Sequence, residues 1–155
     1  MKKFLALLLA ALMLVSLLGC GSVAQIPETV GSVPVTTEPQ IEEDGWYYSA
    51  EDVSAYLVTY GHLPANFITK SEARSLGWEG GSVERYAEGC AIGGDKFGNR
   101  EGLLPKADGR QYYECDIDTN GADSRGAKRL VFSNDGLIYY TEDHYESFVL
   151  LYGEE

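Results

Sequence analysis

The sequence predicts an α+β domain in which N-terminal helices pack on a C-terminal antiparallel β-sheet. Two helix-start patterns occur before residue 78, whereas the later sequence consists of short alternating segments separated by glycines. The 11 tyrosines and 18 glycines, against 2 methionines, favour a twisted sheet with many turns over a helical bundle. A chain of 155 residues with this apolar content can fill one core, so we expect a single domain and, by default, a monomer.

Residues 1–19 have the pattern of an export signal. Lys2 and Lys3 precede an apolar run that is too short to span a bilayer comfortably. Small residues before Cys20 resemble the cleavage site of bacterial lipoproteins, so we expect a lipid-modified Cys20 and an exported protein at the cell surface. An ordinary signal peptide, with release into the medium, is the alternative. Residues 20–45 are proline-rich and end in an acidic cluster, which predicts a disordered tether before a domain at 46–155.

Two helices are predicted at the start of the domain. SAED at residues 49–52 has the form of a capping box, followed by apolar residues at helical spacing and then a glycine. TKSE at residues 69–72 is a second box, and its shorter helix should stop at Gly77. Lys70 then lies in a first turn, where a cation opposes the helix dipole. Either Lys70 has a functional role or it is a solvated surface lysine.

Short strands are predicted in the second half of the chain. Residues 110–117 alternate so that Glu114 and Asp116 share one face. Residues 130–132 and 137–141 flank a Ser-Asn-Asp-Gly sequence, which is typical of a β-hairpin turn. The alternation therefore places Glu114 in mid-strand on the polar side of the sheet.

Cys90 and Cys115 are the two cysteines beyond Cys20. In an exported chain an even pair favours a disulfide, which would stabilise the fold by roughly 3 kcal/mol through loop closure. Two free thiols are the alternative, because sequence spacing does not show that the Cα atoms lie within bonding reach.

The residues that remain for chemistry are a carboxylate, a histidine and several cations. No metal site or cofactor is predicted, because the two histidines lie far apart, no cysteines form a CxxC pair and nucleotide-binding glycine motifs are absent. Glu114 on a strand and His144 at a strand end could act as base and acid, with cations stabilising charge on phosphorus. Together they suit cleavage of a phosphodiester by its own 2′-hydroxyl. A structural histidine among ordinary surface charges is the alternative.

Four motifs carry a family resemblance: YGHLPANFITKSEARSLGW (60–78), IGGDKFGNREGLLP (92–105), ECDI (114–117) and LIYYTEDHY (137–145). In their order and spacing, they resemble the barnase-type secreted bacterial guanyl-preferring ribonucleases. The resemblance covers about 100 residues from residue 52 onward. It implies the microbial ribonuclease fold and cleavage of single-stranded RNA 3′ to guanosine through a 2′,3′-cyclic phosphate.

The resemblance also implies residue roles. Glu114 matches the general base and His144 the general acid. The residues that match those holding the scissile phosphate and transition state are Lys70, Arg125, Arg129 and Tyr145. The segment that matches the guanine-binding loop is Phe97, Gly98, Asn99, Arg100 and Glu101, and Asp95 matches an acidic residue that supports the site. Two departures matter: Arg125 is aligned through a gap, and Gly98 replaces a common serine, which weakens the expected base preference.

Charge sets this chain apart from its basic relatives. Residues 46–155 carry 10 Lys and Arg against 19 Asp and Glu, so the overall field repels RNA. We expect RNA as substrate, slow association, and local positive charge at the site. The resemblance further implies a barstar-type protein inhibitor as a partner. The competing hypothesis is a nonenzymatic surface lipoprotein that retains the ribonuclease fold.

Overall fold

This computed structural model describes residues 40–154 of the chain. These residues contain a single β-sheet. Six strands follow one another in sequence order across it: β1 (Phe67–Ile68), β2 (Ala91–Phe97), β3 (Tyr112–Asp116), β4 (Arg129–Ser133), β5 (Ile138–Thr141) and β6 (Val149–Tyr152). Neighbouring strands are antiparallel except for β1 and β2, which run parallel. The α+β class is therefore confirmed, with one parallel pair that the sequence pattern did not predict.

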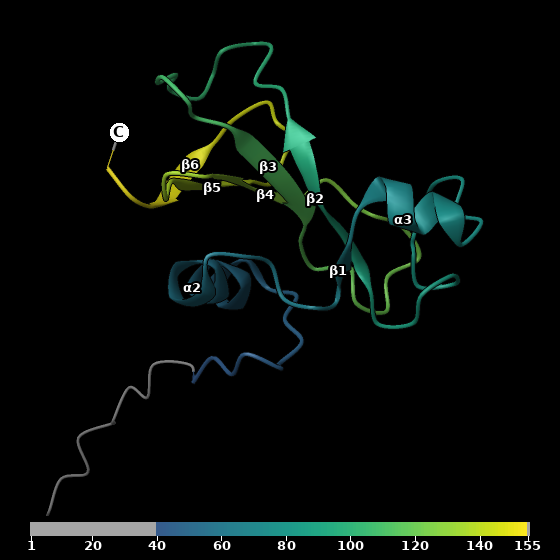
Figure 1. The fold of residues 1–155 in the computed structure, drawn as a ribbon. Helices are drawn as coiled ribbons and strands as arrows, with labels where there is room; N and C mark the ends of the chain where they lie inside the picture. The colour runs from purple at the N-terminus through teal and green to yellow at the C-terminus, as the bar shows by residue number, and fades with distance from the viewer. Residues whose placement is uncertain (1–39, 155) are drawn as a thin grey trace, which may run out of the picture. The chain divides into compact units, whose positions relative to one another are not determined.

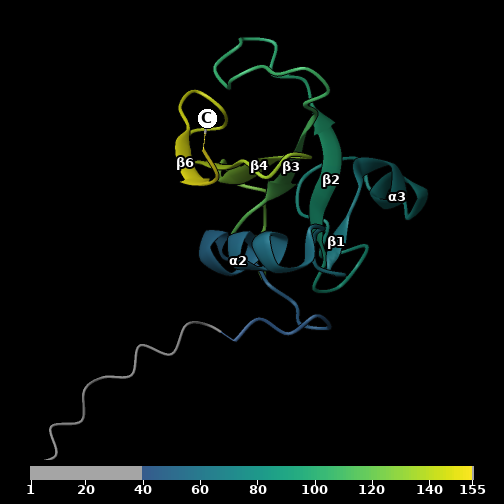
Figure 2. The same ribbon diagram turned by 60° about the vertical axis from the view of Figure 1, so that its left-hand side comes forward.

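The helix α2 (Ala50–Tyr60) lies against one face of the sheet (Figures 1 and 2). The Asp52 N–H donates to the Ser49 hydroxyl at 3.0 Å, and Gly61 ends the helix in the left-handed conformation. Val53 and Leu57 of α2 pack with Cys115, Ile117, Leu130 and Ile138 in the first core cluster. Ser49 is therefore the N-cap, as predicted, but the reciprocal half of the capping box is not formed, because the Asp52 carboxylate accepts from the Ser49 hydroxyl at 2.8 Å. The helix α2 covers the sheet face that carries Cys115.

The helix α3 (Lys70–Ser75) lies beside β2 (Figure 2). Its capping box is complete, because the Thr69 side chain accepts from the Glu72 N–H while the Glu72 carboxylate accepts from the Thr69 N–H. The helix ends at Ser75, and Gly77 follows with a positive φ of 93°. Ala73 and Trp78 pack with Val83 and Ile92 to form a second cluster that fixes the helix to the sheet.

The register of β3 places the polar residues of the site. Glu114 is opposite Asp95 of β2 and Val131 of β4, and Asp116 is opposite Arg129. A bulge interrupts the pairing between Gly93 and Asp95. A Cβ on Gly93 would lie 2.7 Å from the Cβ of Cys115, so the close approach of β2 and β3 requires glycine there.

The hairpin predicted between β4 and β5 is confirmed. The Ser133 N–H donates to the Leu137 carbonyl at 2.8 Å, and Gly136 takes the positive φ that the turn requires. A third cluster of Leu104, Tyr112, Val131, Leu137 and Tyr139 lies on the sheet face opposite α2, with Phe97, Tyr145 and Phe148 packed against it. The site residues Glu114 and Asp116 belong to that same face because they alternate with Cys115 and Ile117.

The folded domain begins earlier than predicted. Tyr60 donates from its hydroxyl to the Ile41 carbonyl at 3.0 Å, and Tyr56 donates to the Glu43 carbonyl at 2.8 Å. These contacts attach residues 41–43, the end of the predicted tether, to α2. The predicted signal peptide, Cys20 and the tether up to residue 39 lie outside the described residues. Within residues 40–154, no helix is long and apolar enough to cross a membrane.

The disulfide favoured by the cysteine count is not formed. Cys90 and Cys115 are both free thiols. Cys115 lies in the first core cluster, whereas Cys90 packs against the second one with Trp78. Burial raises the pKa of both thiols. The alternative of two free thiols is the one that the structure contains.

Candidate active site

Glu114 lies at the centre of the candidate site. Its side chain is only 11% exposed, and both carboxylate oxygens have donors. The Lys70 ammonium pairs with Oε1, and the Tyr145 hydroxyl donates to Oε2 at 2.5 Å. Because a carboxylate oxygen can accept two hydrogen bonds, Glu114 retains capacity for a substrate hydroxyl. A carboxylate held in one orientation with spare acceptor capacity can serve as a general base.

Lys70 is placed by the start of α3. Its backbone N–H donates to the Asp95 carboxylate at 2.8 Å, so an acidic side chain from β2 accepts from the first turn of the helix. The Lys70 side chain crosses to Glu114 on β3 and is 27% exposed. The cation that opposes the helix dipole is therefore stabilised by Glu114, and Asp95 positions the turn that carries it.

Asp116 joins the two arginines of the site, and sequence reasoning did not include it. Arg125 binds it with two parallel hydrogen bonds, from Nε at 2.7 Å and Nη2 at 2.8 Å. Arg129 Nε lies 2.8 Å from Asp116 Oδ1 as a charge contact. The alternation of β3 predicts that Asp116 lies on the same sheet face as Glu114. It does not indicate that Asp116 binds Arg125, which lies nine residues later in a loop.

The two arginines differ in accessibility. Arg129 is 2% exposed, and its guanidinium donates to the carbonyls of Arg125, Gly126 and Lys128. The Arg125 side chain is 23% exposed and lies 5.8 Å from the centre of the Trp78 ring. Burial opposes the charge on Arg125, but the bonds with Asp116 outweigh it and raise its pKa. Arg125 is therefore the more open of the two to an incoming phosphate.

A strained loop presents His144 and Tyr145. Their φ angles are 59° and 78°, which non-glycine residues rarely adopt and which cost roughly 1–3 kcal/mol each. The loop is held by Asp143, which accepts hydrogen bonds from the Thr141 hydroxyl and from the Ser147 N–H and hydroxyl. These bonds lower the pKa of Asp143 to about 2, with the Ser147 hydroxyl as the first cause.

The strained loop connects the histidine to the carboxylate through Tyr145. The rings of His144 and Tyr145 lie 4.8 Å apart, and Tyr145 is the residue that donates to Glu114. Burial, followed by the bond with Glu114, raises the pKa of Tyr145 well above its usual range, so the phenol stays protonated. His144 is exposed and forms no hydrogen bond with any of residues 40–154. The Tyr145 side chain therefore links the His144 ring to the Glu114 carboxylate.

The predicted guanine loop follows directly from β2. Asn99 is buried with a φ of 42°, and its side chain binds both the N–H and the carbonyl of Leu104. Arg100 and Glu101 are exposed. Phe97 lies with its ring centre 5.2 Å from that of Tyr145. The Asn99 side chain thus fixes the loop shape, and Phe97 joins the loop to the Glu114 site.

The described residues include no group of three or more His, Cys, Asp or Glu side chains that could hold a metal ion. Arg125 is linked to the site through Asp116 and the strand register, even though the sequence comparison aligned it only through a gap. Asp116 and Asp143 are the residues that sequence reasoning missed. The only signal for Asp143 was its place beside His144.

The model of one protein family, described as ribonuclease, matches residues 50–152. The chain belongs to the ribonuclease family. A ribonuclease from Heyndrickxia coagulans is 50% identical to it over 100 residues, which are 63% of this chain and 91% of that protein. A Bacillus intermedius ribonuclease is also 50% identical over 100 residues, 63% of this chain and 61% of that protein.

The similarity extends to more distant ribonucleases. The guanyl-specific ribonuclease Sa3 of Kitasatospora aureofaciens is 36% identical over 92 residues, 59% of this chain and 60% of that protein. The family predicted from the four motifs is therefore confirmed. The strand that carries Glu114 and the loop that carries His144 both lie inside the range that the ribonuclease family model matches.

Proposed function

We propose that this ribonuclease cleaves single-stranded RNA 3′ to guanosine by metal-independent general acid–base catalysis. The observation that carries the proposal is Glu114, held between Lys70 and Tyr145, with His144 against the Tyr145 ring. A base and an acid on either side of a phosphodiester, with cations beside them, are what transphosphorylation requires.

In the first step Glu114 takes the proton of the 2′-hydroxyl, and the 2′-oxygen forms a bond to phosphorus. The bond from phosphorus to the 5′-oxygen breaks, and His144 protonates that leaving oxygen. The products are a 2′,3′-cyclic phosphate and a free 5′-hydroxyl. In the second step His144 takes a proton from water, and the water oxygen forms a bond to phosphorus. The bond from phosphorus to the 2′-oxygen breaks, Glu114 returns a proton to that oxygen, and the product is a 3′-phosphate. A bell-shaped pH profile is expected from this pair.

The cations contribute by stabilising charge on the phosphoryl oxygens. Lys70 is adjacent to Glu114, and Arg125 is the arginine with the more exposed side chain. Arg129 is buried, so we assign it to holding Asp116 and supporting the Tyr145 side of the site. Charge placed before the reaction costs no reorganisation at the transition state.

The base would be selected by the loop after β2. Asn99 clamps this loop, which leaves its backbone amides and the exposed Glu101 carboxylate for the edge of guanine. The names of two relatives support a preference for guanine, because both Sa3 and ribonuclease St of Saccharopolyspora erythraea are called guanyl-specific. Ribonuclease St is 49% identical over 57 residues, which are 37% of this chain and 56% of that protein. Cleavage of GpU over ApU is the direct measure of it.

Export and lipid attachment at Cys20 are part of the proposal. They rest on the lysine-led apolar run and the small residues before the cysteine. Mass spectrometry of the mature N-terminus tests them. A diacylated Cys20 is expected, and an unmodified N-terminus beyond residue 20 would rule out the lipid anchor.

The catalytic assignment is tested by GpU turnover in EDTA. Glu114→Gln and His144→Ala should each lower kcat by about 100- to 10,000-fold, the usual contribution of a general acid or base. Glu88→Gln and His62→Ala are matched controls, because both residues are exposed and lie outside the site. They should keep wild-type rates.

The rival is a nonenzymatic surface lipoprotein with the ribonuclease fold. Wild-type protein without turnover would favour that rival. Turnover that survives both Glu114→Gln and His144→Ala would instead show that other residues carry the reaction. Either result would reject the proposed roles.

A further inference from the structure

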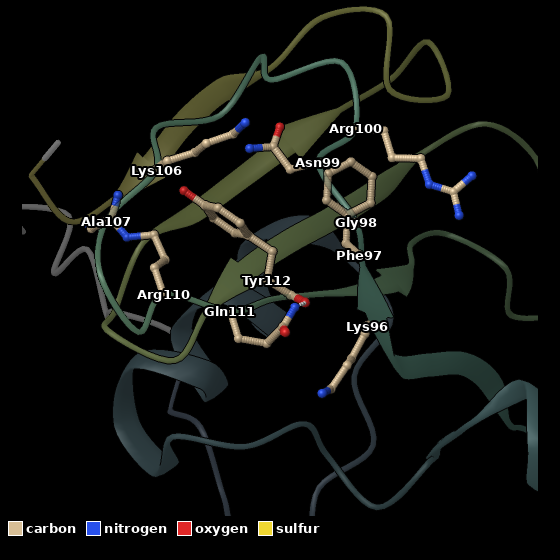
Figure 3. A pocket seen from close by; sticks show the side chains of 10 residues that line it. All are labelled: Lys96, Phe97, Gly98, Asn99, Arg100, Lys106, Ala107, Arg110, Gln111 and Tyr112. Carbon is tan, nitrogen blue, oxygen red and sulfur yellow. Dashed lines mark hydrogen bonds between the residues drawn. The ribbon is translucent and has the colours of Figure 1, made fainter.

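A pocket of about 590 Å³ adjoins the predicted guanine loop, and residues 97–100 of that loop line it. It opens between the end of β2, the segment 98–111 and the start of β3. Figure 3 shows Tyr112 at its centre and Lys106 and Arg110 near the hydroxyl end of its ring, whereas the charged ends of Lys96 and Arg100 point away from the ring. The pocket thus combines an aromatic ring and two nearby cations with two further cations at its rim, beside the loop that would hold the base.

The charge of this pocket is opposite to that of the domain. Its ten lining residues include four cations and no acid. Residues 46–155 as a whole carry 10 Lys and Arg against 19 Asp and Glu. Four of those ten cations therefore line one hollow, which makes it a local exception to a field that repels polyanions.

Most of this charge has no partner. Lys70, Arg125 and Arg129 of the catalytic site are each paired with a carboxylate. Lys96, Arg100 and Lys106 are exposed, and none forms an ion pair within residues 40–154. Their charge is available to an external anion.

Arg110 has a different role in the pocket. It binds the Asp135 carboxylate through Nε at 2.8 Å and the Pro105 carbonyl through Nη1 at 3.2 Å. The Tyr112 hydroxyl donates to the same Pro105 carbonyl at 2.8 Å. These bonds hold the segment that carries Lys106, so Lys106 is presented from an anchored loop.

The position of the pocket beside the guanine loop indicates which part of a bound RNA strand would lie near it. Residues 97–100 line the pocket and belong to the guanine loop. Tyr112 precedes Glu114 by two residues on the same face of β3, a spacing of about 7 Å. No residue of the proposed catalytic set lines the pocket. The strand 3′ to guanosine must leave past Glu114 and His144, so the 5′ side is the part directed toward the pocket.

We propose that this pocket binds the phosphate on the 5′ side of the guanosine. Lys106 supplies the charge beside the Tyr112 ring, Lys96 and Arg100 add positive charge at the rim, and Arg110 positions the loop. The inference rests on the proposed function, because it takes the guanine position from that function. It explains how an acidic domain can hold an RNA chain: the free positive charge lies beside the catalytic cluster rather than in it.

The test compares cleavage of GpU with that of 5′-phosphorylated pGpU at low salt. Wild-type protein should show kcat/KM about fivefold higher for pGpU, as expected for a few partly exposed charge contacts. Lys106→Ala and Lys96→Ala should each bring the ratio of pGpU to GpU toward one. Arg85→Ala, which removes an exposed charge away from the pocket, is the matched control and should keep the wild-type ratio.

The outcomes separate this inference from the proposed function. If GpU itself is not cleaved, the proposed function fails. If GpU is cleaved but pGpU is no better, or if the gain persists in both lysine variants, the pocket assignment is wrong. GpUp, with its extra phosphate on the 3′ side, provides the last comparison, since a Lys106-dependent gain for GpUp but not pGpU would also overturn the assignment.

Discussion

The Lys70 ammonium pairs with the Glu114 carboxylate, so the first turn of α3 acts directly on the middle of β3. Lys70→Ala should lower kcat/KM for GpU by about 100-fold, because a preorganised charge at the reacting groups is lost. Lys70→Arg keeps the charge and should recover part of the activity. Steady-state kinetics of the three proteins checks this. A loss below about threefold in Lys70→Ala would place Lys70 outside the reaction.

The buried Asp116 should be essential for stability. Asp116→Asn leaves Arg129 as a buried charge without its carboxylate, which should reduce the free energy of unfolding by about 3–5 kcal/mol. Asp118→Asn is the matched control, because Asp118 is 45% exposed and pairs with the exposed Lys128. That substitution should cost less than about 1 kcal/mol. Urea unfolding measures both, and equal effects would contradict the role given to the buried pair.

Gly98→Ser should sharpen base selection. The φ of Gly98 is not positive, and a Cβ there would meet Arg100 Cγ at 3.5 Å, an ordinary contact. A serine should therefore fold normally, restrict the loop and add a hydroxyl. We expect the ratio of kcat/KM for GpU over ApU to rise by about 2- to 10-fold, the value of one hydrogen bond. An unchanged ratio with intact stability would show that Gly98 does not limit the preference.

The contribution of Asp143 to the free energy of unfolding should decrease at acid pH. Its pKa in the folded protein is about 2, below the ordinary 3.8, because it accepts hydrogen bonds from Ser147 and Thr141. A lowered folded pKa means that its contribution is complete above the unfolded value and is lost as pH falls through about 2. The difference in unfolding free energy between wild type and Asp143→Asn should be constant at neutral pH and shrink below pH 4, as the unfolded carboxyl protonates.

A control separates Asp143 from the general acid response of the protein. Asp123 is exposed, so Asp123→Asn should follow wild type at every pH. Urea unfolding at several pH values between neutral and the acid range would show this. A pH-independent difference between wild type and Asp143→Asn would mean that the carboxylate charge is not what holds the loop.

The parts of the fold that could be predicted are those governed by neighbours in the sequence. Thr69 and Glu72 form their reciprocal cap, and strand alternation placed Glu114 on the correct face. The parallel pairing of β1 was not foreseen, since two residues are too short to show a period. The edge strand β6 was not foreseen either, because its four exposed residues are all apolar and do not alternate.

Side-chain partners were harder to predict than elements. Arg125 and Arg129 were both assigned to the phosphate, but the sequence could not show that they share Asp116 or that one is buried. Asn99 was placed in the guanine loop, but its side chain is used inside the protein on Leu104. These outcomes depend on the direction of each side chain and on residues brought close by folding. The disulfide prediction was wrong for the same reason, because the number of residues between two cysteines does not determine the distance between them in the fold.

The contact of residues 41–43 with α2 determines on which side of the domain residue 40 lies. The chain enters the domain at α2, and α2 covers the sheet face of Cys115, whereas Glu114 belongs to the opposite face. A support coupled at residue 40 would therefore meet the back of the sheet. The catalytic face would stay open to a long RNA strand.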